Sequence, residues 1–277
     1  LERIEALAPP LINENADWRD WALRLAGKEP KDWRSDKATR EAVERLLAAA
    51  PAPHGVDAPG KPVTIERALA IASAALTFGQ VQRATLHPDG TPESDATHTV
   101  MLALLVADVA AREGLDVGLA VQFAVVHDVP ETYAGDTNTA RGLSPDAAAE
   151  KSAREAASLV RLRAELGQCW TMAMVDRYEA QQEPEARLVR YLDKVLPKLT
   201  HALNGGLALA EIGMSAREVE TKHAEQGAKL RALYPEMKTT RALFDDACAL
   251  ALDTMQKREA ASPLPKSGPT CDWCGGS

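Results

Sequence analysis

Apolar residues recur along much of this 277-residue chain at spacings of three and four positions, the period of an amphipathic helix. The first strong pattern begins at Thr64, whose hydroxyl suits it to cap a helix N-terminus. It places Ile65, Leu69, Ala72 and Leu76 on one face. We therefore expect the main folded region to start with an amphipathic helix at this point.

Similar patterns predict the later helices. The segment after Val117, VGLAVQFAVV, is apolar almost all round, and its ten-residue length with Ala and Gln favours a buried helix over a buried strand. Its end is set by Pro130, so that His127 and Asp128 fall on its last turn. The other predicted helices run over residues 97–112 (closed by Gly114), 145–166 (begun by Ser144), 184–203 (kinked at Pro197), 215–233 and 239–257.

Composition agrees with helices. Alanine and leucine are abundant, aromatics are 4% of the residues, and clusters of β-branched residues are scarce, so an all-α fold is expected. We divide the chain into an N-terminal helical extension (1–50), a linker rich in Pro and Gly (51–62), a main domain (63–235), a C-terminal helix (236–262) and a flexible tail (263–277).

Charge and cysteine content limit the partners and the compartment. A formal charge of -8 gives no general attraction to nucleic acid or to anionic membranes, so we expect neither as a partner. No uninterrupted apolar stretch is long enough to span a bilayer, and the first residues lack the order of a signal peptide. Four cysteines are too few for a disulfide scaffold. We expect a soluble, cytoplasmic protein.

A set of histidines and aspartates carries the candidate chemistry. His98 lies early in one predicted helix, His127 and Asp128 end the next, and Asp193 lies within a later apolar helix. Alone, His98 fits a core histidine and the His-Asp pair fits a helix cap. Asp193 shares its face with apolar residues, where an unpaired carboxylate is costly, so a shared site is favoured. Two imidazoles and two carboxylates suit one divalent ion, Mn, Co, Fe, Ni or Zn.

The order of these residues resembles the HD-domain superfamily, and within it the YfbR-type 5'-deoxynucleotidases. The resemblance covers roughly residues 64–205 and rests on Arg83, on His98, on the run HDxxExxxGD at 127–136, and on Asp193 in the string ARLVRYLDK. It implies an all-α HD-domain helical bundle, one divalent metal, a homodimer or larger assembly, and release of phosphate from (deoxy)nucleoside 5'-monophosphates by attack of a metal-bound water.

Roles follow from the resemblance position by position. It implies that His98, His127, Asp128 and Asp193 are the metal ligands, and that Glu131 handles protons at the water or at the leaving oxygen. Asp136 would position water or the sugar. Arg83 would bind phosphate, a task that suits its fixed planar charge.

Some residues depart from the family pattern. Relatives often carry a tryptophan after the arginine, where its bulk disfavours a ribose 2'-hydroxyl, whereas this chain has Ala84 in the substrate-binding position. Thr132 replaces the second acid that is typical of guanosine-tetraphosphate hydrolases. The alternatives are an HD-fold dNTP triphosphohydrolase and a non-catalytic nucleotide-binding regulatory protein. The Cys271 and Cys274 pair looks like half of a zinc knuckle without its other half, and an unstructured tail is favoured.

Overall fold

The computed structural model describes residues 62–167 and 169–261. The predicted N-terminal extension, nearly all of the predicted linker, and the tail with Cys271 and Cys274 lie outside these described residues. Within the described ranges, no helix is long and apolar enough to cross a membrane.

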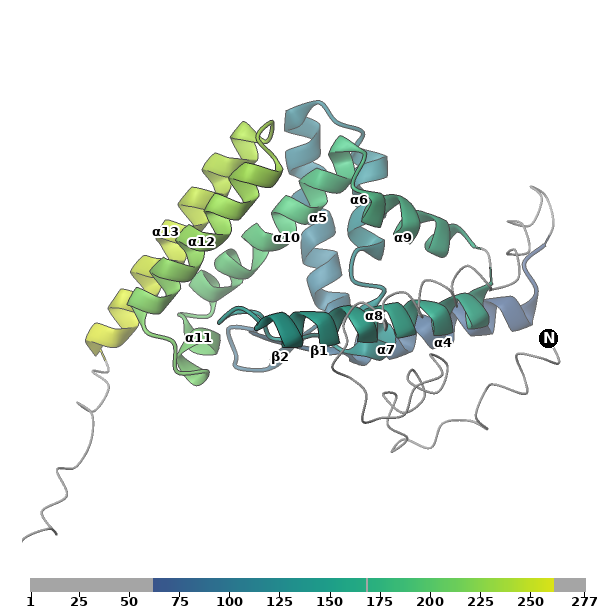
Figure 1. The fold of residues 1–277 in the computed structure, drawn as a ribbon, viewed down its shortest axis with the longest axis horizontal. Coiled ribbons are helices and arrows are strands. Elements are labelled where there is room, and N and C mark those ends of the chain that lie inside the picture. The colour runs from purple at the N-terminus through teal and green to yellow at the C-terminus, as the bar shows by residue number, and fades with distance from the viewer. Residues whose placement is uncertain (1–61, 168, 262–277) are drawn as a thin grey trace, which may run out of the picture.

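Helices dominate the described part of the chain, which confirms the predicted fold class (Figure 1). In order, the elements are α4 (Ile65–Gln80), β1 (Gln82–Leu86), β2 (Pro92–Ser94), α5 (Asp95–Glu113), α6 (Val117–Val126), α7 (Glu131–Ala134), α8 (Pro145–Leu166), α9 (Trp170–Ala180), α10 (Pro184–Leu203), α11 (Leu207–Glu211), α12 (Ala216–Leu233) and α13 (Lys238–Ala261).

Helix ends lie where capping residues predict them. The Thr64 hydroxyl accepts a hydrogen bond from the backbone N–H of Arg67, and Ser144 caps α8 in the same way. Gly114 ends α5 in the left-handed conformation at φ 71°, which glycine adopts without a side-chain clash. Pro197 lies inside α10, which continues to Leu203 as one helix.

A two-stranded antiparallel hairpin joins α4 to α5, in a segment for which no strand was predicted. Gln82 pairs with Ser94 and Leu86 with Pro92. The strands are short and Pro92 starts the second, so period-two alternation is hard to recognise in the sequence. The hairpin brings β1 close to the start of α5, which matters for the site below.

The core is organised around α10, which contacts α5, α6, α9 and α13 (Figure 1). The expected buried helix is confirmed, because Phe123, Ala124 and Val126 of α6 are fully buried. Helix α10 buries Leu188 and Leu192 toward the same core. The predicted C-terminal helix corresponds to α13, which packs against α10 and α12.

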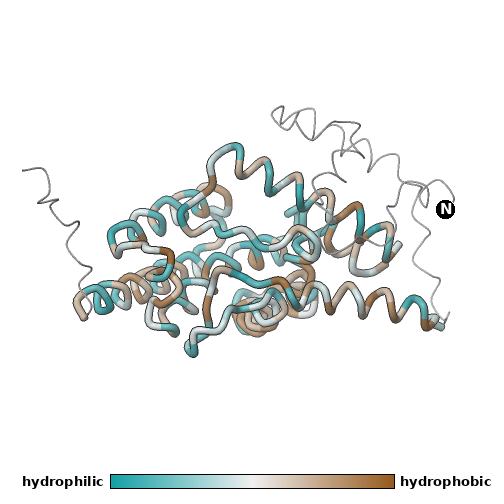
Figure 2. The backbone as a smooth tube through the Cα atoms, turned by 90° about the horizontal axis from the view of Figure 1, so that it is seen from below, coloured by the Kyte–Doolittle hydropathy of each residue, from teal (hydrophilic) through white to brown (hydrophobic). Residues whose placement is uncertain are grey.

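The helix predicted from Thr64 is confirmed as α4, and its predicted apolar face is largely exposed in the described structure. Ile65, Leu69 and Leu76 are 67%, 61% and 70% exposed, and Figure 2 shows apolar positions along this outlying helix. The helix contacts α5, α7 and α8, and Ala74 is its buried residue. The predicted homodimer or larger assembly stays a prediction.

Two leucines of α5 offer a matched test of this packing. Leu102 is fully buried, whereas Leu104 is 71% exposed. We expect Leu102→Ala to lower the free energy of unfolding by about 2–5 kcal/mol, because it removes apolar contacts and leaves a cavity. Leu104→Ala should change it by less than about 0.5 kcal/mol. Urea titration followed by circular dichroism measures both. Equal effects of the two substitutions would contradict the packing described here.

Candidate metal centre

His98 is placed by the capped start of α5. Ser94 caps the helix through the backbone N–H of Thr97, which puts His98 within the first turn with its side chain buried. Its Nδ1 lies 2.7 Å from Glu93 Oε1, and its Nε2 lies 3.1 Å from Asp193 Oδ1. A carboxylate only accepts, so Nδ1–H donates to Glu93 and Nε2 is turned toward the centre.

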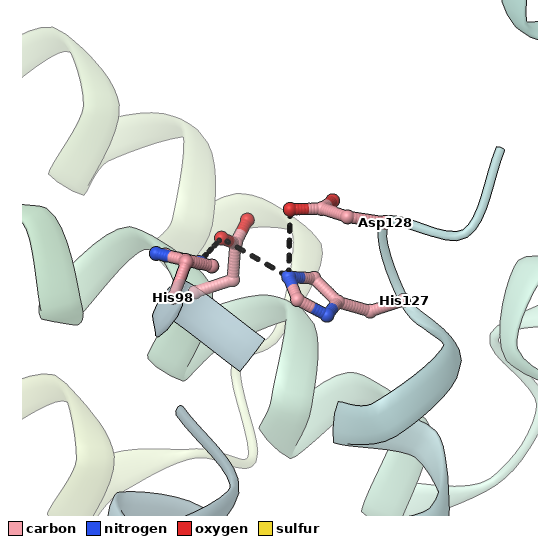
Figure 3. Close-up of side chains that lie close together, drawn as sticks. His98, His127 and Asp128 are labelled. Atoms are coloured by element: carbon pink, nitrogen blue, oxygen red, sulfur yellow. Dashed lines mark hydrogen bonds and ion pairs between the residues drawn. The ribbon is translucent and has the colours of Figure 1, made fainter. Parts of the chain in front are cut away.

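His127 and Asp128 follow the last residue of α6. The Nδ1–H of His127 donates to the carbonyl oxygen of Ala124 at 2.8 Å, which again turns Nε2 toward the centre. That Nε2 lies 2.9 Å from Asp128 Oδ2 and 3.8 Å from Asp193 Oδ1 (Figure 3). It is buried and has no hydrogen-bond partner. An orphaned imidazole nitrogen facing two carboxylates fits a metal ligand.

Asp193 comes from the middle of α10, between the buried Leu192 and the partly exposed Lys194. Its Oδ2 accepts a hydrogen bond from Lys194 Nζ at 2.7 Å, while Oδ1 faces both imidazoles. The inward orientation predicted from the helix face is confirmed.

The structure brings together His98, His127, Asp128 and Asp193, with one ligand atom of each lying within 4.8 Å of the others. Bonds from a Zn-type ion to nitrogen or oxygen are roughly 2 Å long, so the ligand atoms of one ion lie within about 4 Å of one another and small side-chain shifts would close this set on one ion. The donor set also fits, since imidazole and carboxylate together suit borderline divalent cations. These residues could therefore hold the predicted metal.

The pKa of His98 is raised and the pKa values of Asp128 and Asp193 are lowered, because these groups lie close together with opposite charges. Burial alone would lower the pKa of His98, but hydrogen bonds to Asp193 and Glu93 outweigh it and raise that pKa to about 9. Burial alone would raise the pKa of Asp193, yet Lys194 and the imidazoles hold it well below its usual value. The pKa of Asp128 is likewise lowered, against burial, by His127. Without metal, the centre holds an imidazolium between carboxylates.

Arg83 reaches this centre from β1. Its Nη1 donates to Asp95 Oδ1 at 2.9 Å and to Asp128 Oδ2 at 2.7 Å. The guanidinium thus lies beside a candidate metal ligand, where it could also meet a phosphate. Asp95, Asp128 and Glu131 form a second group of clustered carboxylates, and Arg83 bridges the first two of them.

The remaining predicted residues lie close by. Glu131 opens α7 with its side chain buried, and burial together with the Asp128 and Asp136 carboxylates raises its pKa to about 8, against the effect of Lys151. The backbone N–H of Ala84 donates to Asp136 Oδ2 at 3.4 Å, which links the exposed Ala84 to the residue expected to hold water or sugar.

Sequence reasoning missed Glu93, Asp95 and Lys151. The first two belong to the acidic segment before His98, which the sequence analysis did not connect to Arg83 or to the imidazole because the hairpin was not foreseen. Lys151 lies 20 residues after Glu131 on another helix, and no spacing rule links them. In the described ranges, the clusters of potential metal ligands include neither His201 nor the free Cys169 and Cys248.

Comparison with known proteins identifies the family of this chain. A family model described as HD domain matches residues 79–234, which is more than half of the chain. The chain belongs to the HD-domain family, and the resemblance stated above is confirmed at this level.

A zebrafish (Danio rerio) protein named 5'-deoxynucleotidase HDDC2 is 32% identical over 115 residues, 38% of this chain and 52% of that protein. The chain thus spans about half the length of this curated relative. A crystal structure of a predicted metal-dependent phosphohydrolase from Magnetospirillum magnetotacticum MS-1 is similar over 68% of this chain and 98% of that one. It shares 25% sequence identity, with a TM-score of 0.49.

The raised pKa of His98 generates a test of metal binding. At neutral pH the His98 imidazole of the metal-free protein is doubly protonated, and a metal must displace the proton on Nε2. We expect apparent affinity for Mn²⁺ or Co²⁺ to rise about tenfold per pH unit from pH 6 until it levels off near pH 9. Calorimetric titration measures this dependence and should show about one proton released per ion bound near neutrality.

Two variants serve as controls. Glu93→Gln removes a carboxylate that raises the His98 pKa, so the pH dependence should level off at lower pH. His127→Ala removes a proposed ligand and should weaken binding at every pH by at least about tenfold, since loss of even an outer partner typically costs 10- to 100-fold. An unchanged affinity in His127→Ala would contradict the assignment.

Proposed function

We propose that this protein is a metal-dependent phosphohydrolase that releases phosphate from (deoxy)nucleoside 5'-monophosphates. The observation that carries the proposal is the convergence of the four potential ligands with Arg83 and Glu131 at one buried centre. The name of the zebrafish relative supports the nucleotide class.

The ligands His98, His127, Asp128 and Asp193 would hold one divalent ion. Such an ion lowers the pKa of a coordinated water and screens the charge of a phosphate. The overall charge of the chain is -8, so attraction of an anionic substrate must come from local positive charge at this site. Arg83 supplies that charge from β1, and its planar guanidinium can donate two parallel hydrogen bonds to phosphate oxygens.

Hydrolysis adds a water-derived hydroxyl to phosphorus and breaks the bond from phosphorus to O5', which must gain a proton. Glu131 suits this transfer because its raised pKa lets it hold a proton near neutrality. Asp136 lies beside the β1 backbone at Ala84, where it would orient water or the sugar. Proton transfer is thus assigned to Glu131, and orientation of the water or the sugar to Asp136.

Other functions stay open as alternatives. A dNTP triphosphohydrolase would use the same ligands with a longer phosphate chain. A non-catalytic nucleotide-binding protein would have no need for Glu131, whose buried carboxylate among other carboxylates is costly to keep without a use. We favour the monophosphatase, acting on a nucleotide in the cytoplasm.

Glu131 gives the sharpest test of catalysis. We expect Glu131→Gln to lower kcat by about 10²- to 10⁴-fold, the usual contribution of a general acid or base, with metal content unchanged. Phosphate release from dAMP with Mn²⁺ or Co²⁺ measures it. The matched control is Glu225→Gln on α12, where Glu225 pairs with Lys222 at the surface. A wild-type protein that releases neither phosphate from nucleoside monophosphates nor triphosphate from nucleoside triphosphates would exclude the enzyme.

Ala84 generates a prediction about the sugar. Its methyl group leaves room that a tryptophan would fill, so we expect the kcat/KM for dAMP to exceed that for AMP by less than about a hundredfold, or about 2.7 kcal/mol. Ala84→Trp should increase this ratio. Gln82→Trp, another exposed position of β1, is the control. A wild-type preference for dAMP above about a hundredfold would contradict the assigned role of Ala84.

A further inference from the structure

Lys151 of α8 reaches across to the candidate proton-transfer residue. Its Nζ donates to Glu131 Oε1 at 3.0 Å and also bonds the carboxylate of Glu155, one turn further along α8. The lysine side chain is 23% exposed and that of Glu131 8%. This interaction comes from the N-terminal half of α8 and is partly shielded from water.

The two oxygens of Glu131 have different surroundings. Oε1 is held by Lys151, whereas Oε2 is buried and has no hydrogen-bond partner. Asp128 and Asp136 act on the same carboxyl group as like charges. Whenever Glu131 is ionised, repulsion from these carboxylates favours turning its side chain away, and the Lys151 cation on Oε1 opposes that movement.

Backbone packing supports this arrangement. Glu131 belongs to α7, a single turn that makes its main contacts with α8. The backbone N–H of Tyr133 on α7 donates to Ser158 Oγ on α8 at 3.2 Å. Helix α8 therefore fixes both the backbone of α7 and, through Lys151, one carboxylate oxygen.

We propose that Lys151 is a positioning residue for Glu131, and that Glu155 directs Lys151 from within the same helix. The lysine holds Oε1 so that Oε2 faces the reacting atoms. This inference rests on the proposed function, since it assigns the way in which Glu131 is presented to a substrate.

A double-mutant cycle tests the proposal. We expect Lys151→Met to lower kcat for dAMP at least about tenfold, with KM changed less than about threefold and the metal content unchanged. Lys151→Arg, which keeps the charge, should recover part of the loss. In a Glu131→Gln background, Lys151→Met should have no further effect on kcat, because the group it positions is already lost.

The matched control is Lys257→Met, which removes a lysine paired with Asp253 at the same i,i+4 spacing on α13. Its kcat should equal that of the wild type. Additive losses in the Lys151 and Glu131 cycle, or a full kcat in Lys151→Met, would overturn the proposal.

A second readout needs no substrate. In the metal-free protein, Lys151→Met should lower the Tm. In a Glu131→Gln background, Lys151→Met should lower the Tm less than it does in the wild type, because a neutral amide in place of the carboxylate no longer needs a cation partner. If no nucleotide is hydrolysed, the proposed function fails. The Tm cycle still shows whether Lys151 and Glu131 interact. Coupling supports Lys151 as the partner that holds Glu131, and additivity overturns it.

Discussion

The crowding of carboxylates around two buried imidazoles is the constraint on which the rest of this structure depends. Burial penalises each charge, and like charges a few ångströms apart add to the cost. The described structure offsets this with cations from separate elements: Arg83 from β1, Lys194 from α10 and Lys151 from α8. A divalent ion at the four-ligand group would neutralise the charge further.

Because the balancing charges come from different elements, the site and the fold depend on each other. The hairpin carries Arg83 to Asp95 and Asp128, and Asn204 at the end of α10 donates to the carbonyl oxygen of Leu86 in the same strand. Helix α10 thus supplies Asp193 at its centre and anchors β1 at its end. The short strands are better understood as a support for Arg83 than as part of a sheet.

Local patterns in the sequence predicted much of this arrangement. Caps and periodicity located α5, α8, α10, α12 and α13 to within a few residues, and the inward face of α10 identified Asp193. The hairpin was missed because β1 has only five residues and β2 only three, and because β2 begins at Pro92. The exposure of the apolar face of α4 could not be predicted, because periodicity shows that a helix has an apolar side whereas tertiary contacts decide whether that side is covered.

The residues that sequence reasoning missed share a physical reason. Glu93, Asp95 and Lys151 act on other polar side chains rather than on the predicted metal, and such partners obey distance in space rather than spacing along the chain. A metal ligand such as Asp193 can be recognised in the sequence, because a polar residue on an apolar helix face interrupts the apolar periodicity. Lys151 lies on a charged helix, where a lysine interrupts no apolar pattern. Only the packing of α7 against α8 distinguishes it from the other charged residues of that helix. Residues that position the side chains of a buried site are therefore found in the structure, by identifying the cation that contacts each buried carboxylate.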